Sequence, residues 1–120
     1  MTKVLIIDDA AFMRMMIKSI LERNGFEVVG EASNGILGVM EYKKCNPDLV
    51  TMDITMPEMG GLEALQAIME YNPRAKVVMV SAMGQEDMVK QAILSGAKSF
   101  LVKPFKEDQV VEILSKIAHY

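Results

Sequence analysis

The sequence predicts an α/β domain built on a doubly wound parallel sheet, and two observations support this prediction. Short apolar runs alternate along the chain with longer segments of helical periodicity, as in strand–helix–strand units with right-handed crossovers. Most of the runs are almost continuously apolar, which is typical of strands buried on both faces of a parallel sheet. The 120 residues suffice for one such domain, and 51% of them are hydrophobic.

Five strands are predicted from the apolar runs. In chain order these are Val4–Ile7, Glu27–Ala32, Leu49–Met52, Val77–Val80 and Phe100–Val102. The second run mixes polar residues with Gly30, which a strand at the edge of a sheet tolerates. We expect helices to cover both faces of the other four strands.

Five helices are predicted from apolar residues that recur at helical spacing. In chain order these are Phe12–Leu21, residues 35–44, Leu62–Met69, Met88–Ile93 and Val110–Ile117. Ser33 and Asn34 are suitable caps for the start of the second helix. Gly38 lies inside this helix, where a glycine costs about 1 kcal/mol relative to alanine if it is exposed.

Composition excludes several classes of protein. With 16 acidic and 13 basic residues the net charge is −3, which argues against nucleic-acid binding through the overall field. Cys45 is the single cysteine, so neither an internal disulfide nor a cysteine-based metal cluster is expected. The N-terminus lacks a signal pattern, and no apolar run approaches membrane-spanning length. We expect a cytoplasmic protein without membrane insertion, organised as one domain over residues 1–120 with no output domain.

Polar residues follow four of the predicted strands at their carboxyl ends. Asp8 and Asp9 follow the first strand, Asp53 the third, Ser81 the fourth and Lys103 the fifth. Ligands of doubly wound sheets bind outside the carboxyl ends of the strands. If these strands are neighbours, three carboxylates, a hydroxyl and an ammonium group converge on one crevice.

These residue types suit phosphoryl transfer. Clustered carboxylates with open positions favour Mg²⁺, which readily shares a phosphate ligand, and Mn²⁺ could substitute for it. Asp53 would be a nucleophile toward phosphorus, while Lys103 and Ser81 would stabilise the charge on the transferred group. Each residue taken alone has a structural alternative. These are a helix cap at Asp8-Asp9, a turn cap at Asp53, a helix cap at Ser81 and an ordinary loop at Lys103-Pro104.

The set D8-D9, D53 within MDITMPEMGG, S81-A82 and K103-P104-F105 resembles the receiver domain of two-component response regulators over the whole chain. The stretches DDAAFMRM, TMDITMPEM and VSAMGQEDMV are similar to CheY-like single-domain regulators of chemotaxis. The resemblance implies a flavodoxin-like (βα)5 fold with the strand order 2-1-3-4-5.

The resemblance also implies a role for each site residue. Asp53 would be the phosphoacceptor and would bind Mg²⁺ together with Asp9 and the backbone carbonyl of Thr55, while Asp8 would act through a metal-bound water.

Four further residues take roles from the same resemblance. Lys103, Ser81 and the backbone N–H of Ala82 would hold the phosphoryl oxygens. Phe100 would turn inward when Ser81 moves, and the bond before Pro104 would be cis.

The implied function is that of a signalling protein, not an enzyme, although it would catalyse its own phosphotransfer and slow autodephosphorylation. A CheA-like histidine kinase would be the donor, and a flagellar or archaellar motor switch protein, or an adaptor, would be the target. A phosphatase is a further partner, and the chain is expected to be a monomer. The expected partner surface lies on the fourth helix, fifth strand and fifth helix and comprises Val89, Ile93, Phe100, Val102 and Lys116.

Other functions would need other residues or would use the same ones differently. A receiver that acts as a phosphorelay intermediate in another two-component pathway fits the same residues. A haloacid-dehalogenase-like phosphatase would need a second aspartate at Thr55, and a cobalamin-binding module would need a histidine in a DxHxxG loop, which the chain lacks. A degenerate receiver would lack the site residues that are present here.

Overall fold

The computed structural model describes residues 1–119, in which five strands alternate with five helices. The strands are β1 (Lys3–Ile7), β2 (Glu27–Ala32), β3 (Leu49–Asp53), β4 (Val77–Ser81) and β5 (Ser99–Val102). The helices are α1 (Ala11–Arg23), α2 (Gly35–Cys45), α3 (Gly61–Tyr71), α4 (Glu86–Leu94) and α5 (Glu107–Ala118). Each predicted element is present, with ends that shift by a few residues.

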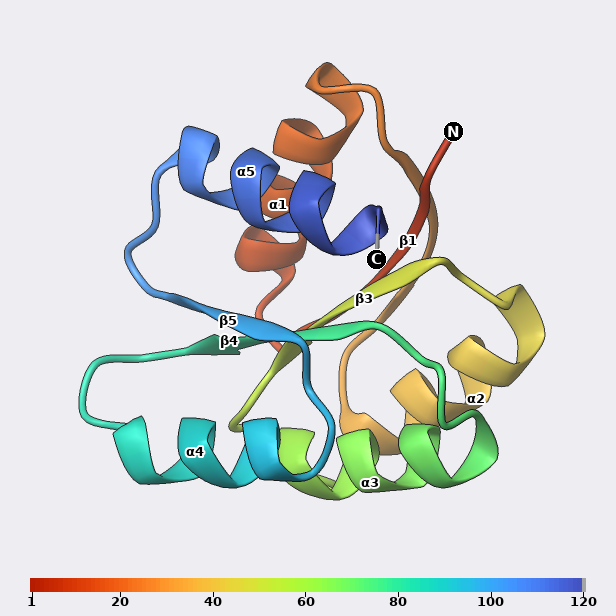
Figure 1. Ribbon diagram of the computed structural model, residues 1–120, viewed down its shortest axis with the longest axis vertical. Coiled ribbons are helices and arrows are strands. Elements are labelled where there is room, and N and C mark those ends of the chain that lie inside the picture. The colour runs from red at the N-terminus through yellow and green to blue at the C-terminus, as the bar shows by residue number, and fades with distance from the viewer. Residues whose placement is uncertain (120) are drawn as a thin grey trace.

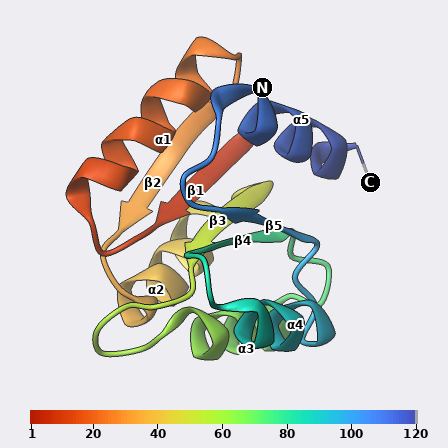
Figure 2. The same ribbon diagram turned by 90° about the vertical axis from the view of Figure 1, so that its left-hand side faces the viewer.

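The strands form one parallel sheet in the order β2-β1-β3-β4-β5, which confirms the predicted fold class and places β2 at an edge. Helices α1 and α5 cover one face of the sheet, and α2, α3 and α4 cover the other (Figures 1 and 2). Asn34 caps α2 as predicted, because its side chain accepts a hydrogen bond from the N–H of Leu37. Among residues 1–119, no helix has the length and apolarity that crossing a membrane requires.

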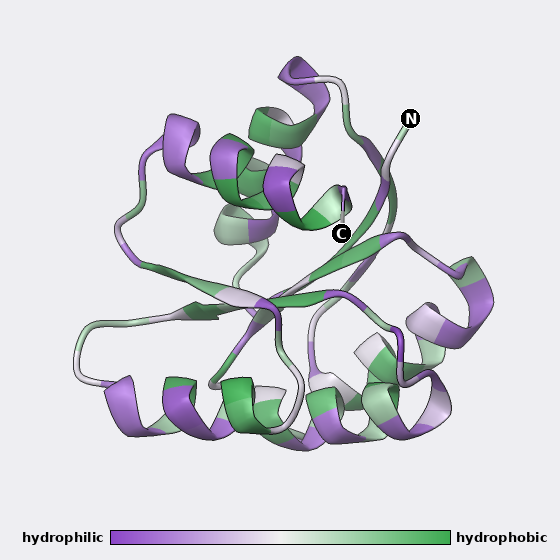
Figure 3. Cartoon of the chain, viewed as in Figure 1, coloured by the Kyte–Doolittle hydropathy of each residue, from purple (hydrophilic) through white to green (hydrophobic). Residues whose placement is uncertain are grey.

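Two apolar cores lie on the two faces of the sheet, because successive side chains of a strand point to opposite faces. Leu5 and Ile7 pack toward α2 and α3, whereas Val4 and Ile6 pack toward α1 and α5. Figure 3 shows the inner strands as mostly apolar and the helices as alternating between apolar and polar residues. This packing fixes the strand ends that carry the polar residues.

Strand β5 departs from the prediction that both of its faces are covered. Leu101 is buried, but Phe100 and Val102 keep 42% and 39% of their surface exposed. The strand lies at an edge and pairs with β4 alone, and its residues Phe100 and Val102 line a groove beside α4. The continuous apolar run of β5 therefore has one buried face, at Leu101, and one partly exposed face, at Phe100 and Val102.

Gly38 also differs from the expectation for an exposed helical glycine, because it is buried against β1. A Cβ at this position would lie 2.7 Å from Cδ1 of Ile7 and 3.0 Å from its Cγ2. The glycine therefore allows α2 to approach the sheet closely, and its cost in helix propensity is offset by packing.

Candidate functional site

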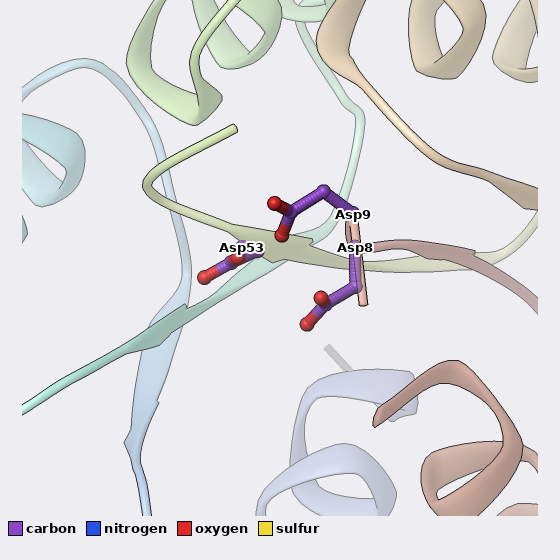
Figure 4. A group of neighbouring side chains, drawn as sticks. All are labelled: Asp8, Asp9 and Asp53. Carbon is purple, nitrogen blue, oxygen red and sulfur yellow. The ribbon is translucent and has the colours of Figure 1, made fainter. Parts of the chain in front are cut away.

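Three carboxylates meet where β1 and β3 end. Asp8, Asp9 and Asp53 each place one carboxylate oxygen within 4.8 Å of the others, and Figure 4 shows the three side chains at the adjoining strand ends. Asp8 and Asp53 are only 1% and 7% exposed, whereas Asp9 is exposed. Strands β1 and β3 are neighbours and Ile7 lies opposite Met52, so the residues that follow them reach the same edge of the sheet.

Asp53 and Ser81 are the last residues of β3 and β4, one position later than the predicted strand ends. Asp53 lies opposite Val80, and Ser81 lies opposite Val102. Both side chains are therefore held by strand backbone at the rim of the crevice.

The turn at Asp8 is fixed by three hydrogen bonds. Its backbone N–H donates to the carbonyl of Ala32 over 3.0 Å, and its Oδ1 accepts from the N–H of Ala10 over 2.9 Å. Arg14 Nη1 donates to the Asp8 carbonyl over 2.6 Å, and the same guanidinium pairs with Glu31 over 3.3 Å. Asp8 therefore contributes to the turn before α1 through its backbone and through one of its two carboxylate oxygens, Oδ1.

Lys103 reaches the carboxylates from β5. Its Nζ lies 3.6 Å from Asp8 Oδ2 and 3.5 Å from Asp53 Oδ1, so it supplies part of the positive charge that the clustered carboxylates require. Its backbone N–H donates to the carbonyl of Ser81 over 2.8 Å, and its bond to Pro104 is cis.

The environment raises the pKa of Asp53 from 3.8 to about 6. Burial is the largest cause, and the charge of Asp8 adds to it, whereas the ammonium of Lys103 acts in the opposite direction. Lys103 alone therefore does not balance the site, and a second cation would relieve the remaining repulsion.

The donor set fits a divalent cation. Asp8 Oδ2 is buried and has no hydrogen-bond partner among residues 1–119, although it lies within ion-pair distance of Lys103. Three carboxylates at an open crevice suit Mg²⁺, which takes oxygen ligands and keeps several waters. The acidic cluster is therefore a candidate magnesium site.

Ser81 and Ala82 have partners other than those expected from the resemblance. Ser81 Oγ donates to the carbonyl of Leu101 over 3.4 Å, and the Ala82 N–H donates to Gln85 Oε1 over 2.6 Å. The alternative that Ser81 caps α4 is wrong, because the N-cap of α4 is Gln85.

Four of the five residues of the expected partner surface line a groove of about 540 Å³ between α4 and β5. Ile93, Phe100 and Val102 line it and are exposed, and Lys116 is exposed on α5. Val89 lines the groove but is only 8% exposed, so it forms part of the wall beneath the surface.

Two residues of the site were not found from the sequence. Arg14 donates a hydrogen bond to the backbone carbonyl of Asp8, and the side-chain amide of Gln85 accepts one from the backbone N–H of Ala82. An arginine on the exposed side of a helical pattern and a glutamine before one carry no signal that distinguishes them from ordinary surface residues.

We expect Mg²⁺ to raise the midpoint of thermal unfolding, because it binds the folded carboxylate cluster and not the unfolded chain. At one hundred times its dissociation constant it would add about 2.7 kcal/mol to the free energy of unfolding. The gain should shrink as the pH falls below about 6, where the proton on Asp53 competes with the cation.

Thermal unfolding of two matched variants tests this expectation. Asp9→Asn removes one carboxylate of the cluster and should abolish most of the Mg²⁺ effect. Asp48→Asn removes a carboxylate just before β3, at the other end of that strand, and should leave the effect intact. An equal Mg²⁺ effect in both variants would contradict the assignment of the site.

Comparisons with known proteins agree with this geometry. A family model described as "Response regulator receiver domain" matches residues 4–115. The chemotaxis protein CheY of Thermotoga maritima is 57% identical over 116 residues, which cover 97% of each chain. The CheY of Bacillus subtilis is 60% identical over 114 residues, which cover 95% of each chain.

A solved structure shows the same fold. The chain matches one of the chains in the crystal structure of a CheX–CheY–BeF3–Mg complex from Borrelia burgdorferi with a TM-score of 0.92 and 39% identity, covering 97% of this chain and 88% of that one. The resemblance inferred from the sequence is thus confirmed along nearly the whole chain. The chain belongs to the family of response regulator receiver domains, and within it to the CheY-like members that serve chemotaxis.

Proposed function

We propose that this chain accepts a phosphoryl group on Asp53 from the phosphohistidine of a CheA-like kinase. The observation that carries the proposal is the convergence of Asp8, Asp9 and Asp53 within 4.8 Å, with Lys103 Nζ 3.5 Å from Asp53. The phosphorus–nitrogen bond of the donor would break, with its electron pair returning to the imidazole, while a bond forms between phosphorus and an oxygen of Asp53.

The residues of the chain would divide this work among them. Asp9, Asp53 and the Thr55 carbonyl would hold Mg²⁺ or Mn²⁺, and Asp8 would hold one of its waters. The bound cation would neutralise charge on the phosphoryl oxygens. Lys103 would pair with another of these oxygens, and it already lies within ion-pair distance of the acceptor.

Transmission would begin at Ser81 and Ala82. A phosphoryl group offers strong acceptor oxygens, and the Ser81 hydroxyl would leave the Leu101 carbonyl to donate to one of them. Phe100 is exposed on β5, the strand next to the one that carries Ser81, and would turn into the space that Ser81 vacates. Phosphorylation would in this way shift the population of conformations of the groove between α4 and β5.

The partners of that surface would be a motor switch protein or an adaptor. The groove is lined mainly by apolar side chains, and Ile93, Phe100 and Val102 are exposed around it, which suits an apolar face of a partner. A CheX-type phosphatase would be a further partner, since the Borrelia CheY was crystallised together with CheX. Slow autodephosphorylation would reset the chain in its absence.

Intact-mass spectrometry with acetyl phosphate tests the proposal. The wild-type chain should gain one acid-labile phosphoryl group in the presence of Mg²⁺ and none in the presence of a chelator. Asp53→Asn keeps the size of the side chain, removes the nucleophile and should gain nothing. A wild-type chain that stays unmodified, or an Asn variant that is modified equally, would refute the proposal.

A further inference from the structure

The side chain of Gln85 joins the two loops that flank Asp53. Its Oε1 accepts the N–H of Ala82 over 2.6 Å, and its Nε2 donates to Oγ1 of Thr55 over 2.8 Å. Ala82 directly follows β4, and Thr55 lies two residues after Asp53. We propose that Gln85 is a latch that holds these loops together in the unphosphorylated chain and is displaced when Asp53 is phosphorylated. This inference rests on the proposed function.

The orientation of the amide follows from its partners. The Ala82 N–H can only donate, so the oxygen of the Gln85 amide must face it, and the nitrogen is then left to donate to the Thr55 hydroxyl. Both ends of the amide are thus satisfied by groups that belong to different loops. A single side chain couples the loop after β3 to the loop after β4.

The latch would compete with the phosphoryl group for one donor. The Ala82 N–H makes one strong hydrogen bond, and in the unphosphorylated chain the neutral oxygen of Gln85 accepts it. A phosphoryl oxygen carries charge, and charge-assisted hydrogen bonds are roughly twice as strong as neutral ones. The Ala82 N–H would therefore donate to the phosphoryl group and no longer to Gln85. The displaced Gln85 side chain would also give up its hydrogen bond to the Thr55 hydroxyl.

Gln85 is thus a positioning residue, because it would act through Ala82 and not on the reacting atoms. With the latch in place, a phosphoryl group would bind more weakly than it would to the same crevice without the Gln85 side chain, because the hydrogen bond between Ala82 and Gln85 must first break. Loss of one net hydrogen bond of this kind changes an equilibrium by about threefold to tenfold. If Gln85 instead preorganised the loops for the phosphoryl group, its loss would weaken binding, so the two roles differ in the sign of the effect.

Calorimetric titration with beryllium fluoride and Mg²⁺ separates these roles. Gln85→Ala should bind the probe about threefold to tenfold more tightly than the wild-type chain. Thr55→Val removes the other anchor of the latch and should tighten binding less. The double variant should match Gln85→Ala alone, because both changes break one bridge. Glu86→Gln, an exposed neighbour outside the bridge, is the matched control and should not change affinity.

Unchanged or weaker probe binding in Gln85→Ala, or additive effects in the double variant, would overturn the latch. Amide hydrogen exchange of Ala82 without any probe gives an independent readout. Its exchange should be several times faster in Gln85→Ala, while the amides of β4 stay protected. Equal exchange rates would also overturn the latch. Failure of the wild-type chain to bind the probe would instead overturn the proposed function, and the exchange result would still decide whether the bridge forms.

Discussion

Asp53→Asn is expected to be more stable than the wild-type chain by about 2 kcal/mol at about pH 8 in metal-free buffer. The folded chain resists ionisation of this carboxyl, since burial and the charge of Asp8 raise its pKa from 3.8 to about 6. A shift of this size corresponds to about 3 kcal/mol at most, and water at the open crevice reduces the expected effect. Asparagine keeps the shape and removes the charge.

Because folding raises the pKa of Asp53, the stability difference between the variant and the wild type should depend on pH in one direction. Below about pH 3.8 the carboxyl is protonated in the folded and unfolded chains alike, so the two proteins should differ little. Between pH 3.8 and about 6 the carboxyl of the unfolded chain ionises while that of the folded chain stays protonated, so the advantage of the variant should grow over this range and level off above it.

Urea unfolding across this range measures the difference. Glu22→Gln changes the net charge equally at an exposed position of α1 and should stay within about 0.5 kcal/mol of the wild type at every pH. A stability gain in Asp53→Asn that does not change with pH would show that ionisation is not its cause. Saturating Mg²⁺ should narrow the gap, because it stabilises only the wild-type carboxylate.

Gly61→Ala is expected to lower the free energy of unfolding by about 3 kcal/mol. A Cβ at Gly61 would overlap the backbone carbonyl of Asp53 and lie 2.8 Å from the Cα of Ile54. Both obstacles are backbone atoms, so no side chain can rotate out of the way. The Gly61 N–H also donates to the Ile54 carbonyl over 2.7 Å, which ties the start of α3 to the end of β3.

Gly60→Ala is the matched control for this change. The nearest atom to a Cβ at Gly60 is the Ile54 carbonyl oxygen at 3.5 Å, and its backbone angles of −73° and 170° suit any residue. Its stability should stay within about 0.5 kcal/mol of the wild type in urea unfolding. Gly61→Ala should also weaken Mg²⁺ binding, because relief of the overlap moves Asp53. Equal losses in the two variants would contradict the argument.

The sequence predicted the fold and the members of the acidic crevice because both depend on strong local patterns. Apolar runs fixed the strands, and Asp8, Asp53 and Lys103 were found because a parallel sheet gathers its carboxyl ends at one edge. The neighbouring order of the strands did not come from the runs themselves and required the family resemblance. The roles of these residues in phosphoryl transfer stay predictions.

What the sequence did not predict depends on contacts that no local pattern encodes. The apolar run of β5 alone indicates a strand buried on both faces, and only the family resemblance placed Phe100 on a surface, where it lines the groove beside α4 and is exposed. The pair Gly60-Gly61 shows two glycines without showing which one the Asp53 backbone requires. The role of Gln85 could not be predicted from the sequence either, because one of its partners is a backbone N–H, which every residue except proline has.

The crevice is assembled from four strands whose residues span almost the whole chain, from Asp8 on the loop after β1 to Lys103 after β5. A nascent chain still attached to the ribosome would expose the aspartates before Lys103 had been synthesised. Such a chain would lack the ammonium that pairs with Asp53, and so would any fragment truncated before β5. Under the proposed function, competence to accept a phosphoryl group would therefore arise late in synthesis.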